Sequence, residues 1–127
     1  MKASNAKQIT SQHFEHRVWR NELNFFADEL KIYEHQLEEL VGKGIKEMMP
    51  RLEHFQNSFI RQKEVLDELN HDINVHEQAL AYAMSNDTDE TPAGLYNHDE
   101  SREKFETFKS IYADLKADFM QFLRKWH

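Results

Sequence analysis

Apolar residues recur at alternating steps of three and four over three long stretches of the chain, with polar residues between them. This spacing puts the apolar side chains on one face of a helix, as the a and d positions of a helical bundle require. The pattern is longest in residues 51–84. Its apolar positions are Leu52, Phe55, Phe59, Leu66, Leu69, Ile73, Leu80 and Ala83. A helix over this stretch would be roughly 50 Å long, and because one apolar seam does not stabilise it alone in water, it needs helical partners.

The preceding stretch predicts a first helix over residues 9–42. Its seam is formed by Trp19, Leu23, Phe26, Leu30, Tyr33, Leu37 and Leu40, with His16 at the next position toward the N-terminus. Residues 1–8 are small or polar, so we expect a flexible leader there. Gly42 and Gly44 end the helix, because glycine is favoured at helix C-termini and destabilises helix interiors.

Pro50 leaves two possible starts for the second helix. Proline is tolerated in the first turn of a helix, where its missing N–H would have no partner, so this helix can begin at Pro50 itself. It can instead begin near Ile45 and kink at the proline. Ile45 and Met48 continue the seam that includes Leu52, which favours a helical turn before Pro50. We therefore predict the second helix over residues 46–84.

A polar, acidic segment over residues 85–97 predicts a loop before a third helix. Asn97 with Glu100 three residues later matches a helix-capping pair, so this helix is expected over residues 98–125. Its seam contains no polar interruption and consists of Phe105, Phe108, Tyr112, Leu115, Phe119, Phe122 and Trp126. Three long helices with two connections predict a single all-α domain over residues 1–127, an elongated up-down-up antiparallel three-helix bundle.

Composition narrows the function classes. The 127 residues carry a net charge of −7, whereas nucleic-acid binding needs clustered positive charge, so we expect no nucleic-acid partner. The chain has no cysteine, which excludes disulfides, thiolate metal sites and thiol catalysis. No apolar run is long enough to span a membrane and no signal peptide precedes the first helix, so we expect a cytoplasmic protein without membrane contact. The sequence has no phosphate-binding loop, nucleophile elbow or zinc-protease motif, and we expect neither enzymatic activity nor a cofactor.

The predicted first helix carries more apolar residues than its seam needs. Val18, Phe25 and Ile32 recur every seven residues, and Phe14 precedes Val18 by four. On a helical wheel these four residues lie far from the seam, where a helix with one buried face would be polar. If they form an interaction surface, a homodimer that pairs this helix with its own copy is the simplest geometry. Two alternatives stay open: the third helix covers this side, or these are isolated surface residues.

The chain contains eight histidines, and several gather at one end of the predicted bundle. Antiparallel pairing about the glycine turn puts His16 beside His71, and His13 near His76. Bundle metal sites are built from inward-facing His and carboxylate side chains. The candidate metal ligands are therefore His13, His16, His71 and His76. The alternative is that His16 and His76, both on seams, are core residues that fix the helix register, and Gln62 invites the same interpretation.

Two pairs of segments carry a resemblance to known proteins. Residues 13–16 with 22–26 (HFEH and ELNFF) and residues 53–57 with 67–72 (EHFQN and DELNHD) are similar to a family of small uncharacterised bacterial helical proteins. This resemblance covers the first two helices and implies a bacterial cytosolic protein, without an assigned activity. The three-helix plan with an aromatic-rich first helix also looks like a spectrin-type repeat, which implies an architecture and no function.

These observations predict a non-enzymatic protein–protein interaction or scaffold protein that acts through helix–helix contacts and forms a homodimer. The alternative prediction is a metal-binding helical bundle that uses histidines and carboxylates at one end. Metal content of the purified chain would discriminate the two.

Overall fold

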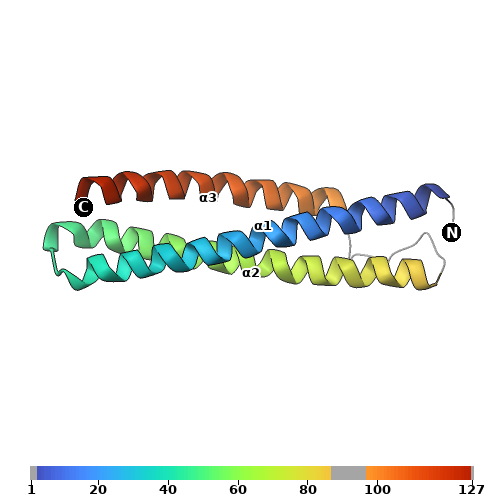
Figure 1. The fold of residues 1–127 in the computed structure, drawn as a ribbon, viewed down its shortest axis with the longest axis horizontal. Coiled ribbons are helices and arrows are strands. Elements are labelled where there is room, and N and C mark those ends of the chain that lie inside the picture. Colours follow the sequence, from blue (N-terminus) through green and yellow to red (C-terminus); the bar gives the residue numbers. More distant parts are fainter. Residues whose placement is uncertain (1–2, 87–96, 127) are drawn as a thin grey trace.

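Three helices lie side by side along one long axis in the computed structural model, which describes residues 3–86 and 97–126 (Figure 1). The helices are α1 (Ala3–Gly42), α2 (Met49–Ser85) and α3 (His98–Trp126), and a short 3₁₀ turn, η1 (Lys46–Met48), precedes α2. α1 and α3 run in the same direction, and α2 runs against them. The described residues contain no strand, so the predicted all-α three-helix bundle is confirmed. Within these residues, no helix is both long and apolar enough to cross a bilayer.

α1 begins six residues before its predicted start. The chain is helical from Ala3, so the helix begins inside the segment 1–8 expected to form a flexible leader. The longer helix has a local reason, because Ala3 and Ala6 are strong helix formers.

Gly44 makes the turn between α1 and α2. Its φ of +66° lies in the left-handed region that glycine adopts without steric cost, and its N–H donates to the carbonyl of Val41 (3.1 Å). The chain then forms η1, and Pro50 lies in the first turn of α2, where it removes no hydrogen bond. The predicted helical turn before Pro50 is therefore confirmed, although it is a 3₁₀ turn.

The predicted acidic loop over residues 85–97 lies mostly outside the described residues. Ser85 is still helical and ends α2. Asn97 caps α3, because its Oδ1 accepts a hydrogen bond from the backbone N–H of Glu100 (3.0 Å). The capping residue predicted from the sequence thus fixes the start of α3, and the helix ends at Trp126, one residue later than expected.

The seam residues of the three helices form one continuous apolar core. In its aromatic part, Phe119 of α3 meets two rings of α2, Phe59 at 5.0 Å and Phe55 at 5.2 Å between ring centroids. Both contacts are edge-to-face, the arrangement that aromatic pairs favour. Because each helix contributes seam residues to this core, none of the three can leave without exposing the apolar faces of the others.

Gln62 interrupts the seam of α2 at mid-bundle. Its side chain is buried, with 6% of the residue exposed, and its Oε1 has no hydrogen-bond partner among the described residues. Gln62 lines a hollow of about 550 Å³ between α2 and α3, together with Val65 and Ile111. A buried amide oxygen without a partner destabilises a fold by about 1–3 kcal/mol, so this position weakens the centre of the bundle.

Candidate functional site

A ladder of ion pairs holds α3 along one flank of α1. Three carboxylates of α1 are spaced by seven residues, and each pairs with a base 87 residues further along the chain. The pairs are Glu15 with Arg102 (2.8 Å), Glu22 with Lys109 (3.5 Å) and Glu29 with Lys116 (3.0 Å). Such pairs correspond to the g and e positions of two parallel helices in a coiled coil. The ladder therefore neutralises the flank of α1 that faces α3.

The last pair of the ladder extends into the core through a tyrosine. Glu29 accepts hydrogen bonds from the Tyr112 hydroxyl (2.5 Å) and from Lys116 (3.0 Å). Burial is the largest influence and would raise the pKa of Glu29, but the hydrogen bonds from Tyr112 and Lys116, together with the charge of Lys116 and a contribution from Tyr33, lower it overall. Burial, followed by the hydrogen bond to Glu29, raises the pKa of Tyr112. Glu29 is thus held as a carboxylate at neutral pH.

The apolar stripe of α1, which we define as Phe14, Val18, Phe25 and Ile32, lies beyond this ladder. These residues are 66%, 38%, 59% and 58% exposed, respectively. The structure therefore contradicts the alternative in which the third helix covers this side of α1. Two interpretations are left for the stripe: an interface with another chain, or isolated surface residues.

Phe25 is supported from beneath. Its ring meets the Phe26 ring edge-on at 5.9 Å, and Phe26 packs against Phe108 at 5.7 Å and Tyr112 at 4.8 Å. Because Phe26 belongs to the partly buried rim of the core, one side of Phe25 contacts that rim while most of its surface meets solvent.

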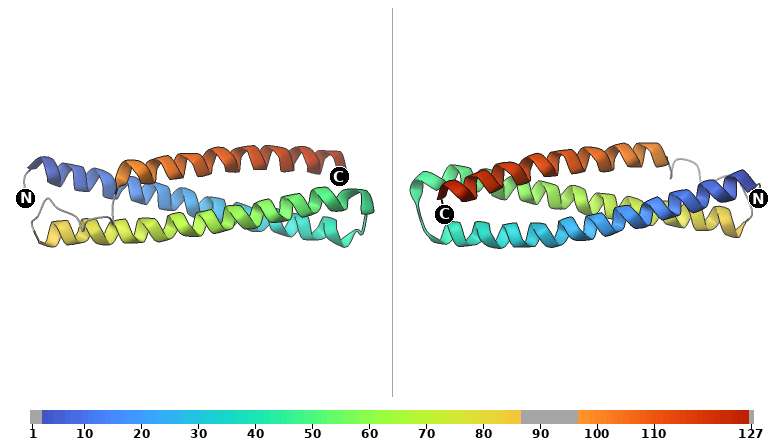
Figure 2. Two further views of the ribbon diagram at one scale, coloured as in Figure 1. Left: turned by 180° about the vertical axis from the view of Figure 1, so that it is seen from behind. Right: turned by 45° about the horizontal axis from the view of Figure 1, so that its top comes forward.

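Three histidines, one from each helix, form a polar layer in the core near the first residue of α3. We call His16, His76 and His98 the histidine layer; they are 0%, 9% and 7% exposed. The His16 ring centroid lies 5.2 Å from that of His98 and 6.0 Å from that of His76, and His98 stacks on Trp19 at 5.0 Å. α1 and α2 continue past the start of α3 (Figure 2), so this layer stands where the bundle changes from three helices to two.

Glu15 ties the histidine layer to the ion-pair ladder. It accepts hydrogen bonds from His98 Nε2 (2.5 Å) and from Arg102 Nε (2.9 Å). The hydrogen bond from Arg102 is the largest influence on Glu15 and, with His98, lowers its pKa to about 2 although burial opposes the shift. The first turn of α3 is therefore attached to α1 by a carboxylate that stays ionised through mild acid.

Two further polar side chains, Glu77 and Ser101, contact the layer. Glu77 of α2 lies 2.7 Å from His13 Nδ1 and 3.6 Å from His16 Nδ1, and the Ser101 hydroxyl lies 3.1 Å from His76 Nδ1. Burial lowers the pKa of His16 to about 4; Glu77 opposes this shift, and the neighbouring imidazoles of the layer add to it. Burial lowers the pKa of His76 as well. Both imidazoles are therefore neutral at physiological pH.

The structure does not bring the four candidate metal ligands together. His16 and His76 join the histidine layer, but His13 is half exposed and His71 is exposed. Among the described residues, no group of three or more His, Asp or Glu side chains is placed to hold a metal ion. His71 is wrongly placed by the sequence because the real turn is centred near η1, so α2 is shifted along α1 and presents His76 to His16.

Sequence reasoning missed His98, Ser101 and Arg102. His98 and Ser101 stand seven and four residues before Phe105, so both occupy seam positions of α3. Because neither is apolar, a seam defined by apolar residues alone stops at Phe105. Extending each seam by one heptad regardless of polarity would have found the third histidine.

Comparison of the chain with models of protein families, with curated proteins and with solved structures gives no match. The resemblance to a family of small bacterial helical proteins therefore stays a prediction. A function has to be inferred from the geometry of the stripe and of the histidine layer.

Proposed function

We propose that this chain is a non-enzymatic protein–protein interaction protein that acts through helix–helix contacts, with the apolar stripe of α1 as its surface and a second copy as its partner. The exposure of four apolar side chains on one face of α1 supports this proposal most directly. Single exposed apolar residues are normal, whereas a row of them is typical of an interaction site. A cytoplasmic location belongs to the same proposal.

The size of the stripe fits a reversible contact. Fully burying a large apolar side chain contributes about 1.5–3 kcal/mol, so a half-exposed one contributes about 1 kcal/mol. A twofold axis makes each of the four residues contribute twice, which gives about 8 kcal/mol. Association costs about 4–15 kcal/mol in lost freedom of motion. The two terms are similar in size, so the stripe supports a dimer that exchanges with monomer.

Replacing Phe25 by aspartate tests this function. The 59% exposed ring would lose about 1.5 kcal/mol of burial per copy, or about 3 kcal/mol per twofold contact, which weakens association by about 10²-fold. Light scattering should show the solution mass falling by a factor of two, while circular dichroism shows unchanged helicity. The matched control is Ile111→Asp, because Ile111 is 50% exposed but lies on α3 away from the stripe. An unchanged mass for Phe25→Asp with intact helicity would contradict the proposal.

The metal-binding alternative stays a prediction. Metal analysis of the untagged chain tests it, because a stoichiometric metal that is lost on His76→Ala would support that alternative instead.

A further inference from the structure

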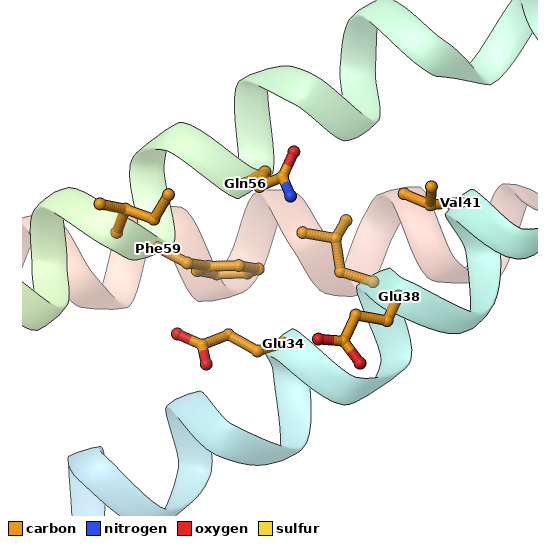
Figure 3. A pocket seen from close by; sticks show the side chains of 7 residues that line it. Glu34, Glu38, Val41, Gln56 and Phe59 are labelled. Carbon is orange, nitrogen blue, oxygen red and sulfur yellow. The ribbon is translucent and has the colours of Figure 1, made fainter.

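The edge of the bundle formed by α1 and α2 carries a hollow at each end, and only residues of these two helices line them. The hollow near the turn has a volume of about 320 Å³ and is shown in Figure 3, with α3 passing behind it. Buried Leu37 and Phe59 form its floor, and Glu34 and Glu38 stand on its α1 rim. On the α2 rim, Ile60 is 52% exposed. This hollow is therefore apolar inside and acidic at one rim.

The hollow at the other end, about 450 Å³ in volume, has a base, Arg20, on its α1 rim. Arg20 lines this hollow and donates a hydrogen bond to Asn74 Oδ1 (2.6 Å). Arg17, one helical turn before Arg20, is exposed. Glu77 of α2 also lines this hollow and lies 2.7 Å from His13 Nδ1. The apolar lining consists of Ile9, Leu80, Ala81 and Met84. The two hollows thus combine apolar interiors with α1 rims of opposite charge.

One row of α1 residues connects the hollows and is symmetric about its centre. The row consists of His13, Arg20, Ala27, Glu34 and Val41, each seven residues after the last. Arg20 lies seven residues before Ala27 and Glu34 lies seven residues after it. When two copies of the helix are placed antiparallel with their Ala27 residues side by side, Arg20 of one copy therefore lies opposite Glu34 of the other. Arg17 and Glu38 form a second such pair one helical turn further from Ala27. Their distances from Ala27 along the chain differ by one residue. A helix with this arrangement is complementary to an antiparallel copy of itself.

We propose that a second copy of this chain docks on the α1/α2 edge in antiparallel orientation, with a twofold axis beside Ala27. Arg17 and Arg20 of one copy then meet Glu38 and Glu34 of the other, twice per contact. Ala27 is small and partly buried, so the two α1 helices approach closely where they cross the axis. The exposed Ile60 and Val41 around the acidic hollow of one copy face the apolar lining of the basic hollow of the other.

This contact goes beyond the proposed function because it uses another side of α1. The apolar stripe lies next to the flank that α3 covers, whereas the symmetric row lies next to α2. A chain with both surfaces forms assemblies larger than a dimer. The charge pattern favours a second copy over an unrelated basic protein, because Arg20 and Arg17 lie before Ala27 at nearly the same distances as Glu34 and Glu38 lie after it.

The experiment isolates this edge by using the Phe25→Asp chain, in which the stripe is disabled. We expect this chain to be a dimer by light scattering at low salt and to dissociate at high salt, because exposed charge pairs are screened. Two further variants on this background, Glu34→Lys with Glu38→Lys and Arg17→Glu with Arg20→Glu, should each be monomeric. Mixed in equal amounts, they should form a heterodimer, because the reversed charges match again.

The control on the same background is Asp114→Lys with Asp118→Lys, a charge reversal of the same spacing on the exposed side of α3, which should leave the dimer intact. If the Phe25→Asp chain is a monomer, the antiparallel contact at the α1/α2 edge is refuted. If the wild type is then a dimer, the apolar stripe still accounts for that dimer. Charge-reversed variants that stay dimeric, or a mixture that stays monomeric, also overturn it. A wild-type mass that Phe25→Asp does not change contradicts the stripe alone.

Discussion

Acid should weaken this bundle, starting at the histidine layer. His16 is fully buried, and its pKa falls from the ordinary value of 6.5 to about 4 in the folded chain, mainly because burial disfavours the charged imidazole. Above the unfolded pKa both states are neutral at this group, and it has no effect on stability. Between the folded and the unfolded pKa, His16 is protonated in the unfolded chain but neutral in the folded chain. The free energy of unfolding therefore falls as the pH falls.

The size of this loss follows from the two pKa values. At about pH 5 the unfolded chain is almost fully protonated at His16 and the folded chain is almost fully neutral, which corresponds to a loss of about 2 kcal/mol. Below the folded pKa the loss reaches its limit of about 3 kcal/mol. The lowered pKa of His76 acts in the same direction. The stabilisation from Glu15, whose folded pKa is about 2, is present above its ordinary value of 4.5 and is lost only at lower pH.

Denaturant titrations at about pH 7.5 and about pH 5, followed by circular dichroism, measure this change. Trp19 stacks on His98 and reports locally on this end by fluorescence, provided that Trp126 is replaced by Phe. His16→Leu should remove most of the difference between the two pH values, whereas His35→Gln, at an exposed position, should leave it unchanged. Equal stability at both pH values, or an undiminished difference in His16→Leu, would refute the reasoning.

Two smaller changes test other parts of the fold, and chemical denaturation measures both. Gln62→Leu should raise the free energy of unfolding by about 1–3 kcal/mol, because an apolar group replaces the buried Oε1 that has no partner among the described residues. A lower free energy of unfolding would show instead that the amide stabilises the fold. Gly44→Ala should lower it by about 1 kcal/mol, because the residue has a positive φ. Gly42→Ala is its control: a Cβ has open space at both positions, but Gly42 is helical, so this change should not destabilise.

The sequence predicts the fold well because the seam residues of each helix are apolar and are buried in the core. Leu23, Phe55 and Phe119, one from each helix, are fully buried. The spacing of such residues along the chain is enough to predict three helices. The start of α1 is harder to predict because Ala3 and Ala6 are small rather than clearly apolar, so nothing in the pattern separates a helical turn from a leader.

The candidate site was less predictable, because it depends on how the helices slide along each other. The apolar stripe could be proposed from spacing within one helix, and the structure shows that it is exposed. Contacts between helices are different. Whether His16 meets His71 or His76 is decided by the residues that η1 adds to the turn. The pairing of Glu15 with Arg102 depends likewise on how far α3 is offset along α1, which no local pattern encodes.

The ion-pair ladder between α1 and α3 has a consequence for folding. Its three rungs repeat every seven residues with the same chemistry, so α3 displaced by one heptad would still form two acid–base pairs. The ladder alone therefore cannot choose between neighbouring alignments, and several slipped states would have similar energies. The histidine layer does not repeat along the bundle. In only one alignment does His98 stack on Trp19 while Glu15 accepts a hydrogen bond from His98. The histidine layer therefore selects one alignment of α3 among those that the ladder allows.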